Sequence, residues 1–167
     1  MESVEDIPRE AILQGLPWDW RTYGEYLSFL DGLPKGINVG GMVGHVAVRW
    51  NVMGEESLDE EPANSEQIAK MCDLVDEAIG AGALGISTSR TLLHRTPDGR
   101  PIPGTFADDD ELFAFADVLG RHGRGVFESA PRFEKAGADW AGLKHEIQTL
   151  GEITRRSGRP STFGLVY

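Results

Sequence analysis

The sequence predicts an α/β fold, specifically part of a parallel (β/α)8 TIM barrel with about four βα units. Two observations predict it. Apolar segments of strand length alternate with amphipathic helical segments in units of about 35–45 residues, as in parallel sheets with crossover helices. Each helix-to-strand connection is short and each strand-to-helix connection is long, and such long loops build the active sites of these barrels. Because about four units cannot close an eight-stranded barrel, we expect a piece of a larger protein.

Residues 1–35 are expected to form an irregular lead-in with one short helix, before the repeated βα units of residues 36–167. Two prolines and a glycine interrupt residues 8–20, which are therefore predicted to be irregular. Two tryptophans of this stretch, Trp18 and Trp20, are expected to pack within the protein rather than to stack on a ligand. A short helix then carries the apolar residues Tyr23, Tyr26, Leu27 and Leu30.

The first strand is predicted over residues 37–43, where an apolar segment runs into a polar turn with His45 and Arg49. A long connection is expected over residues 44–63. Its acidic residues lack the alternate spacing and central glycine of a calcium loop, so we interpret them as a solvated loop. They are Glu55, Glu56, Asp59, Glu60 and Glu61.

The helix predicted over residues 65–79 is the clearest in the chain. Its apolar residues recur at helical spacing: Ile68, Met71, Cys72, Val75 and Ile79. Asn64 is expected to cap its first turn, with Gln67 completing a capping box. Cys72 is the only cysteine, so no internal disulfide can form, and its position predicts a core residue. The next strand is predicted over residues 83–87.

A second long loop is predicted over residues 88–107, then a helix over residues 109–121 with Asp108 and Glu111 as its capping pair. The following strand is expected over residues 125–129. The loop contains a Pro-Asp-Gly turn and suits either a lid over a binding site or mobile surface. Its cationic residues are His94, Arg95 and Arg100.

The last unit repeats the pattern. Asp139 is expected to cap a helix, and residues 162–167 are predicted to form the final strand. The expected inner face of this helix carries Leu143, Ile147, Leu150 and Thr154.

The net charge of −11 argues against a nucleic-acid partner, because a phosphate backbone would be repelled. No apolar run approaches the roughly 20 residues that cross a bilayer, so no membrane association is expected. The acidic N-terminus lacks the apolar segment of a secretory signal. A cytoplasmic protein is therefore expected.

Polar side chains follow the predicted strands, where barrel enzymes keep their chemistry. His45 and Arg49 suit a substrate carboxylate or the support of a neighbouring group, or alternatively an anchored loop. Ser87, Thr88 and Arg90 suit an oxyanion or a carboxylate, although small polar residues also commonly stabilise a turn. These five residues are the candidates for substrate binding.

Glu128 ends a further predicted strand and is the candidate metal ligand, because a carboxylate can bind zinc. The alternative is an ion pair with the neighbouring Arg132. No histidine–aspartate pair accompanies the serines near residues 87–89 in the manner of a serine-hydrolase signature.

Five short segments occur in a distinctive order and spacing. They are residues 1–8 (MESVEDIP), 16–20 (LPWDW), 43–49 (VGHVAVR), 52–54 (VMG) and 81–88 (AGALGIST). Together they resemble the N-acyl-D-amino-acid deacylases, the D-aminoacylase branch of the amidohydrolase superfamily. The resemblance runs over essentially the whole chain but covers only the middle of a typical member.

The resemblance implies a (β/α)8 barrel with a small flanking β domain and zinc at the carboxyl ends of the strands. It implies that a metal-activated water attacks the acyl carbonyl and releases a D-amino acid and a carboxylate. Family members place single histidines at the ends of the fifth and sixth strands. The corresponding stretches here, residues 126–131 and 162–167, contain no histidine, and Glu128 is the available substitute.

We therefore expect a segment of a hydrolase acting on a non-peptide carbon–nitrogen (amide) bond of a small N-acyl amino acid or related amide. The family's remaining ligands and its catalytic aspartate would fall outside residues 1–167, so the fragment alone is expected to be inactive. One alternative is a non-catalytic half-barrel module that self-associates through its uncovered edges. The other is an amidohydrolase with a divergent metal site and a different amide substrate.

Overall fold

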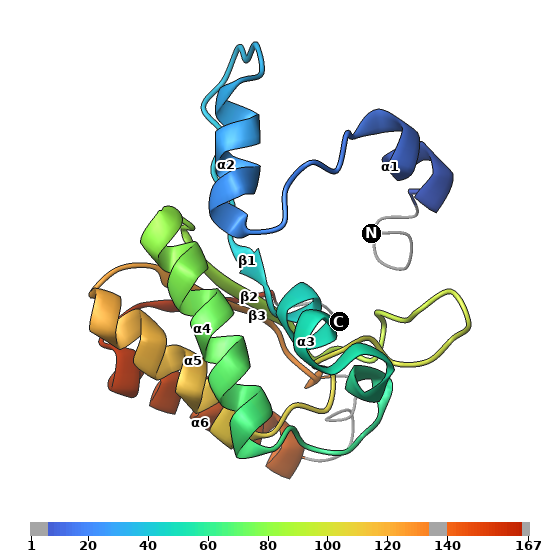
Figure 1. Cartoon of the computed structure of the whole chain (residues 1–167). Helices are drawn as coiled ribbons and strands as arrows, with labels where there is room; N and C mark the ends of the chain where they lie inside the picture. Colours follow the sequence, from blue (N-terminus) through green and yellow to red (C-terminus); the bar gives the residue numbers. More distant parts are fainter. Residues whose placement is uncertain (1–6, 134–139, 165–167) are drawn as a thin grey trace.

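The computed structural model describes residues 7–133 and 140–164, and Figure 1 shows their arrangement. Helices and strands alternate along most of the chain. In chain order the elements are α1 (Arg9–Gly15), α2 (Tyr23–Asp31), β1 (Val43–Gly44), α3 (His45–Met53), the 3-10 helix η1 (Gly54–Leu58), α4 (Ser65–Ala81), β2 (Gly85–Ser89), α5 (Asp109–His122), β3 (Val126–Ala130), α6 (Trp140–Ser157) and β4 (Ser161–Phe163).

The four strands form one parallel sheet in the order β1-β2-β3-β4, which confirms the predicted partial barrel. Strands that are consecutive in the sequence are also neighbours in the sheet. Helices α4, α5 and α6 lie together on one side of it (Figure 1). Parallel strands place all their carboxyl ends at one edge, so the loops after β2 and β3 meet there.

The hydrophobic core lies between this sheet and the three helices. Ile86 of β2 and Phe127 of β3 are buried against Val75 of α4 and Phe115 of α5. Cys72 is half-buried at the margin of this core, and burial raises the pKa of its thiol, as expected for a packing residue. Cys72 therefore packs against the core from its margin, so the predicted assignment to the core is only partly right.

The predicted cap of α4 is also confirmed. The Gln67 backbone N–H donates to Asn64 Oδ1 at 3.0 Å, and the Asn64 backbone N–H donates to Gln67 Oε1 at 2.9 Å. At α5 the prediction is half right. Asp108 caps the helix by accepting from the backbone N–H of Glu111 at 3.3 Å, but the Glu111 carboxylate turns elsewhere.

The strand predicted over residues 37–43 is wrong for most of its length. Only Val43 and Gly44 pair with β2, whereas Ile37 is 77% and Val39 is 52% exposed. An apolar run becomes a strand only where a neighbouring backbone is available to pair with it. Here a single backbone bond, from Leu84 N–H to the Gly41 carbonyl, reaches the preceding residues.

The connection predicted over residues 44–63 is also wrong, because it begins with α3 and η1. Alternating valines made residues 45–53 poor helix candidates from propensity alone. Burial of His45, Val48 and Arg49 on one side of α3 overrides that preference. Further upstream, residues 8–20 are not wholly irregular, since α1 follows directly after its N-cap residue Pro8.

The predicted inner face of α6 is displaced. Leu150 is buried as expected, but Ile147 is 43% exposed and Thr154 is exposed. The side chains that this helix buries are Glu146, Thr149, Leu150, Ile153 and Ser157. The predicted cap Asp139 and residues 165–167 of the final strand lie outside the described residues.

The short helix of the lead-in, α2, is confirmed and carries an aromatic cluster. The ring of Trp20 lies 4.8 Å from that of Phe29 and 5.4 Å from that of Tyr26, between centroids. Trp18 lies 5.6 Å from Trp20 but is 47% exposed, so Trp20 packs within the chain and Trp18 only covers it from outside. Among the residues described, no helix has the length and apolar character needed to cross a bilayer.

Candidate functional site

Side chains of the two central strands alternate between the two faces of the sheet. Ile86 and Thr88 of β2 are buried on the helix side, beside Phe127 and Ser129 of β3. The intervening side chains therefore project to the opposite side, which we call the open face. The open face comprises Ser87, Ser89, Glu128 and Thr162, of which Ser87, Glu128 and Thr162 are partners across β2, β3 and β4.

On the helix side, His45, Arg49, Thr88 and Glu111 form a buried cluster, which we call the His45 cluster. Nε2 of His45 lies 2.5 Å from Oε1 of Glu111, and Nδ1 lies 2.8 Å from Oγ1 of Thr88. Arg49 donates through Nη1 to the other Glu111 oxygen and through Nη2 to the carbonyl of Glu61 at 3.0 Å. The cluster therefore ties α3 and β2 to the first turn of α5.

The electrostatics of the His45 cluster keep Glu111 ionised. Burial acts to raise the pKa of this carboxyl, but the hydrogen bond from His45 and the charges of His45 and Arg49 outweigh it. The pKa of Glu111 is therefore lowered overall. Gly104 packs directly against the His45 ring, since a Cβ at that position would lie 2.9 Å from His45 Nδ1. Because these side chains are buried between the sheet and the helices, a substrate in solvent cannot contact them in this conformation.

A second buried ion pair joins Arg90, just after β2, to Glu146 of α6. Arg90 donates to Glu146 Oε2 at 3.2 Å through Nε and to Oε1 at 2.9 Å through Nη2. A third bond runs from Nη1 to the Ala107 carbonyl at 2.5 Å. Arg132 also lies beside Glu146, with Nη2 3.7 Å from Oε1.

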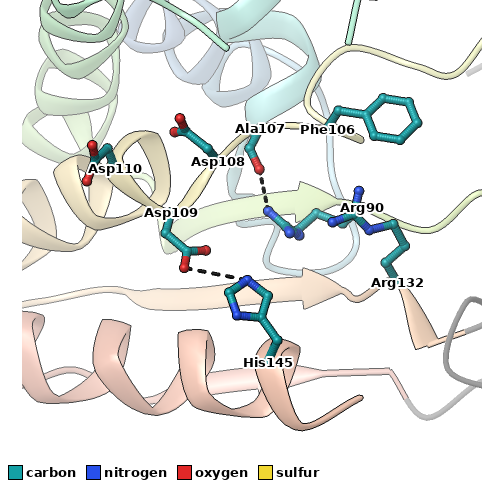
Figure 2. A pocket seen from close by; sticks show the side chains of 8 residues that line it. All are labelled: Arg90, Phe106, Ala107, Asp108, Asp109, Asp110, Arg132 and His145. Atoms are coloured by element: carbon teal, nitrogen blue, oxygen red, sulfur yellow. Dashed lines mark hydrogen bonds and ion pairs between the residues drawn. The ribbon is translucent and has the colours of Figure 1, made fainter. Parts of the chain in front are cut away.

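A cavity of about 440 Å³ opens at this edge of the sheet, between the starts of α5 and α6 (Figure 2). Its walls carry both signs of charge: Arg90, Asp108, Asp109, Asp110, Arg132 and His145, with Phe106 and Ala107. His145 Nε2 lies 3.5 Å from Asp109 Oδ2, and the Arg132 guanidinium stacks 5.5 Å from the centroid of the Phe106 ring. The lining of the cavity is thus polar, and several of its charged side chains already contact one another.

The structure separates the sequence-predicted site residues into two groups. Ser87 and Glu128 are register partners on the open face, where Glu128 is exposed. His45, Arg49, Thr88 and Arg90 are buried on the helix side, each bonded to a partner within the chain. Glu111 and Glu146 are their partners, and the sequence did not predict either pairing. No signal marked them, because each partner lies more than fifty positions away.

The loop after β2 brings His94 back to the open face. Ser89 Oγ and His94 Nδ1 are 2.6 Å apart, and both side chains are half-buried. A tight hairpin follows directly. Arg95 and Pro101 form an isolated antiparallel β-bridge, and the Thr96 backbone N–H donates to the Arg100 carbonyl at 2.8 Å.

The residues present do not fit the zinc site that the family resemblance implies. Within residues 7–133 and 140–164, no three His, Cys, Asp or Glu side chains are placed to hold one metal ion. On the open face Glu128 is the one carboxylate, and its register partners Ser87 and Thr162 offer only hydroxyls. Zinc sites in proteins normally take nitrogen, sulfur and carboxylate ligands.

Known proteins resemble this chain in sequence. No protein-family model matches it. An uncharacterized protein of Mycobacterium tuberculosis (strain ATCC 25618 / H37Rv) is 37% identical over 137 residues, covering 77% of this chain and 22% of the relative. A D-aminoacylase of Alcaligenes xylosoxydans xylosoxydans is 30% identical over 127 residues, covering 76% of this chain and 24% of the relative. The chain thus spans about a quarter of the length of these relatives.

Solved structures agree with the sequence comparison. A D-aminoacylase superposes with a TM-score of 0.65 and 26% identity, over 85% of this chain and 26% of the other. The N-acyl-D-glutamate deacylase of Bordetella bronchiseptica, solved with zinc and a phosphonate inhibitor, superposes with a TM-score of 0.64 and 25% identity. That match covers 84% of this chain and 26% of the other. The chain therefore belongs to the D-aminoacylase family of amidohydrolases, of which it represents one segment.

Proposed function

We propose that the protein containing this segment hydrolyses the amide bond of a small N-acyl D-amino acid. The observation that carries the proposal is the combined match of sequence and fold to D-aminoacylase over about three quarters of the chain. The parallel sheet supports it, because all four strands deliver their carboxyl ends to one edge. Residues 1–167, lead-in and βα units alike, then form part of one barrel.

Within that barrel we assign Ser87 and Glu128 to the substrate side. Both lie on the open face, where the Ser87 hydroxyl can hydrogen-bond a polar group of the substrate and the Glu128 carboxylate can accept one. His45, Arg49, Thr88 and Arg90 take a supporting role, because their buried bonds fix the strand ends from the helix side.

A metal in this protein would need ligands beyond the residues that the structure describes. Glu128 is the side chain of the open face that we propose could join such a set. Zinc analysis of the longer protein carrying Glu128→Gln tests this assignment, because a ligand substitution lowers the bound metal. Unchanged metal content in that variant would rule Glu128 out as a ligand.

The activity is tested on the product of the reading frame that contains residues 1–167, however far that frame extends. We expect release of free amino acid from N-acetyl-D-amino acids and little release from the matched L-enantiomers. Hydrolysis of the D-substrates at the same rate as the L-enantiomers, or no hydrolysis of the D-substrates, would contradict the proposal. The 167-residue chain, assayed in parallel, is expected to be inactive, and activity there would contradict that expectation.

A self-associating half-barrel without activity is the second candidate. Large apolar side chains at exposed positions favour it: Ile37, Val39, Leu84, Leu93 and Trp140, which are 77%, 52%, 55%, 67% and 82% exposed. Light scattering on the purified 167-residue chain tests it. A dimer or larger species supports the module, and a monomer at high concentration contradicts it.

We also propose a cytoplasmic location. A single half-buried thiol, Cys72, suits a reducing compartment. Fractionation of the source cells tests this, and recovery of the protein in the secreted fraction would contradict it.

A further inference from the structure

We propose that Ser89 is an acyl-accepting nucleophile and that His94 is its general base. This inference goes beyond the proposed function and does not depend on it. The observation behind it is the hydroxyl–imidazole contact at the carboxyl end of β2, where Ser89 Oγ lies 2.6 Å from His94 Nδ1. A nucleophile and its base need such a distance before any substrate arrives.

Both partners are held in place by backbone bonds. Ser89 is the last residue of β2 and pairs with Ala130. The next two backbone N–H groups, of Arg90 and Thr91, both donate to the Ala130 carbonyl, at 2.8 and 3.1 Å. His94 stands at the base of the hairpin of residues 95–101, whose turn is closed by the Gly99 N–H donating to the Thr96 carbonyl at 2.8 Å. The contact therefore joins two anchored backbones.

The location also suits a reaction. Ser89 lies on the open face, two residues from Ser87, at the edge where parallel barrels carry out their chemistry. Both Ser89 and His94 are half-buried, so the pair is partly shielded from water yet reachable.

The other histidines show why His94 is distinct. His45 also meets a hydroxyl, that of Thr88, but this pair is sealed on the helix side and bonded to Glu111. His122 and His145 each lie beside an aspartate, Asp76 and Asp109 respectively. Among the contacts of the described residues, His94 alone pairs a ring nitrogen with a hydroxyl that faces the open side.

The chemistry follows from this geometry for a small ester or activated amide. The Ser89 oxygen forms a bond to the acyl carbon while its proton passes to His94 Nδ1. Collapse of the tetrahedral adduct breaks the bond to the leaving group, which takes the proton from His94 and departs as alcohol or amine. Water then gives a proton to His94 as its oxygen bonds to the acyl carbon of the Ser89 ester. The bond from that carbon to the Ser89 oxygen breaks, His94 returns the proton to this oxygen, and the carboxylic acid leaves.

The test uses the purified 167-residue chain and a fluorophosphonate probe, which forms a P–O bond with a nucleophilic serine and releases fluoride. Mass spectrometry of the peptides is expected to place a single adduct on Ser89. Ser89→Ala should abolish it, and His94→Gln should slow it about 100-fold, the usual magnitude of general-base assistance. Ser28→Ala, on the exposed surface of α2 where the hydroxyl donates to the Gly24 carbonyl and has no histidine partner, should label at the normal rate.

Thermal unfolding of each variant separates reactivity from folding. If His94→Gln folds normally and labels as fast as the parent chain, or if no adduct forms on Ser89, the proposal is overturned and the contact merely ties down the loop. Failure here leaves D-amino-acid release by the longer protein untouched. Conversely, labelling of Ser89 without such release would overturn only the proposed function.

Discussion

His45 and Glu111 are 66 positions apart in the sequence, yet Nε2 of the histidine lies 2.5 Å from Oε1 of the glutamate with neither side chain exposed. Arg49 donates to the second oxygen of the same carboxylate. One glutamate thus neutralises a buried arginine and orients a buried imidazole. This relationship joins α3 to α5 and makes the cluster vulnerable to loss of its single acid.

Replacing Glu111 by glutamine is expected to destabilise the chain by about 3–5 kcal/mol, because the Arg49 charge is left buried without its counter-ion. Urea unfolding followed by circular dichroism measures the change. Glu66→Gln is the matched control, since Glu66 pairs with Lys70 on an exposed helix surface and should matter little. A Glu111→Gln midpoint equal to the parent's would contradict the prediction.

Stability is expected to fall on acidification because the pKa of folded Glu111 is lowered. Above the ordinary glutamate pKa both states are ionised and the full stabilisation is present. Below that value the unfolded chain takes up a proton first, so stability declines until the pH passes the lowered pKa of folded Glu111. Urea midpoints between about pH 3 and pH 7 should decline less in Glu111→Gln than in the parent. If the urea midpoints of the parent and of Glu111→Gln declined equally with pH, protonation of Glu111 would not be the cause of the acid sensitivity.

Gly104→Ala is expected to cost stability twice over. The backbone has φ +91°, and the added Cβ would meet His45 Nδ1 at 2.9 Å. Gly99→Ala is the matched control, with φ +86° and no neighbouring atom within 4 Å, so it carries the backbone strain of about 1–2 kcal/mol alone. Thermal unfolding should therefore place Gly104→Ala clearly below Gly99→Ala, and equal melting temperatures would refute the contact with His45.

Arg90→Lys is expected to be markedly destabilising although it keeps the charge. Lysine cannot reproduce the fork that bonds both Glu146 oxygens and the Ala107 carbonyl. Arg155→Lys, at an exposed pair with Glu152, should leave the unfolding midpoint nearly unchanged. A double-mutant cycle with Glu146→Gln measures the coupling, and a coupling near zero would contradict the role given to this pair.

Local signals predicted the scaffold well. The Asn64–Gln67 capping box is read within four consecutive residues, and the parallel order follows from the alternation of strands and helices. Strand 37–43 failed because pairing depends on a neighbour that the local sequence does not contain. Helix α3 was missed because its burial, not its propensity, stabilises it.

The site was less predictable than the scaffold. The position of Glu111 three residues after Asp108 predicted a capping pair, and only the fold brings His45 and Arg49 to its carboxylate. Glu146 likewise disturbs the predicted face of α6, since it turns inward to Arg90 and rotates the buried stripe. Charged residues at apolar positions are explained by partners that are distant in sequence.

The strict alternation along β2 and β3 has a practical consequence for redesign. Positions 87, 89 and 128 can be varied in a library while Ile86, Thr88 and Phe127 retain the contacts that hold the helices against the sheet. New reactivity can therefore be sampled on one surface at little cost to foldability, which makes this small α/β unit a candidate starting material for directed evolution.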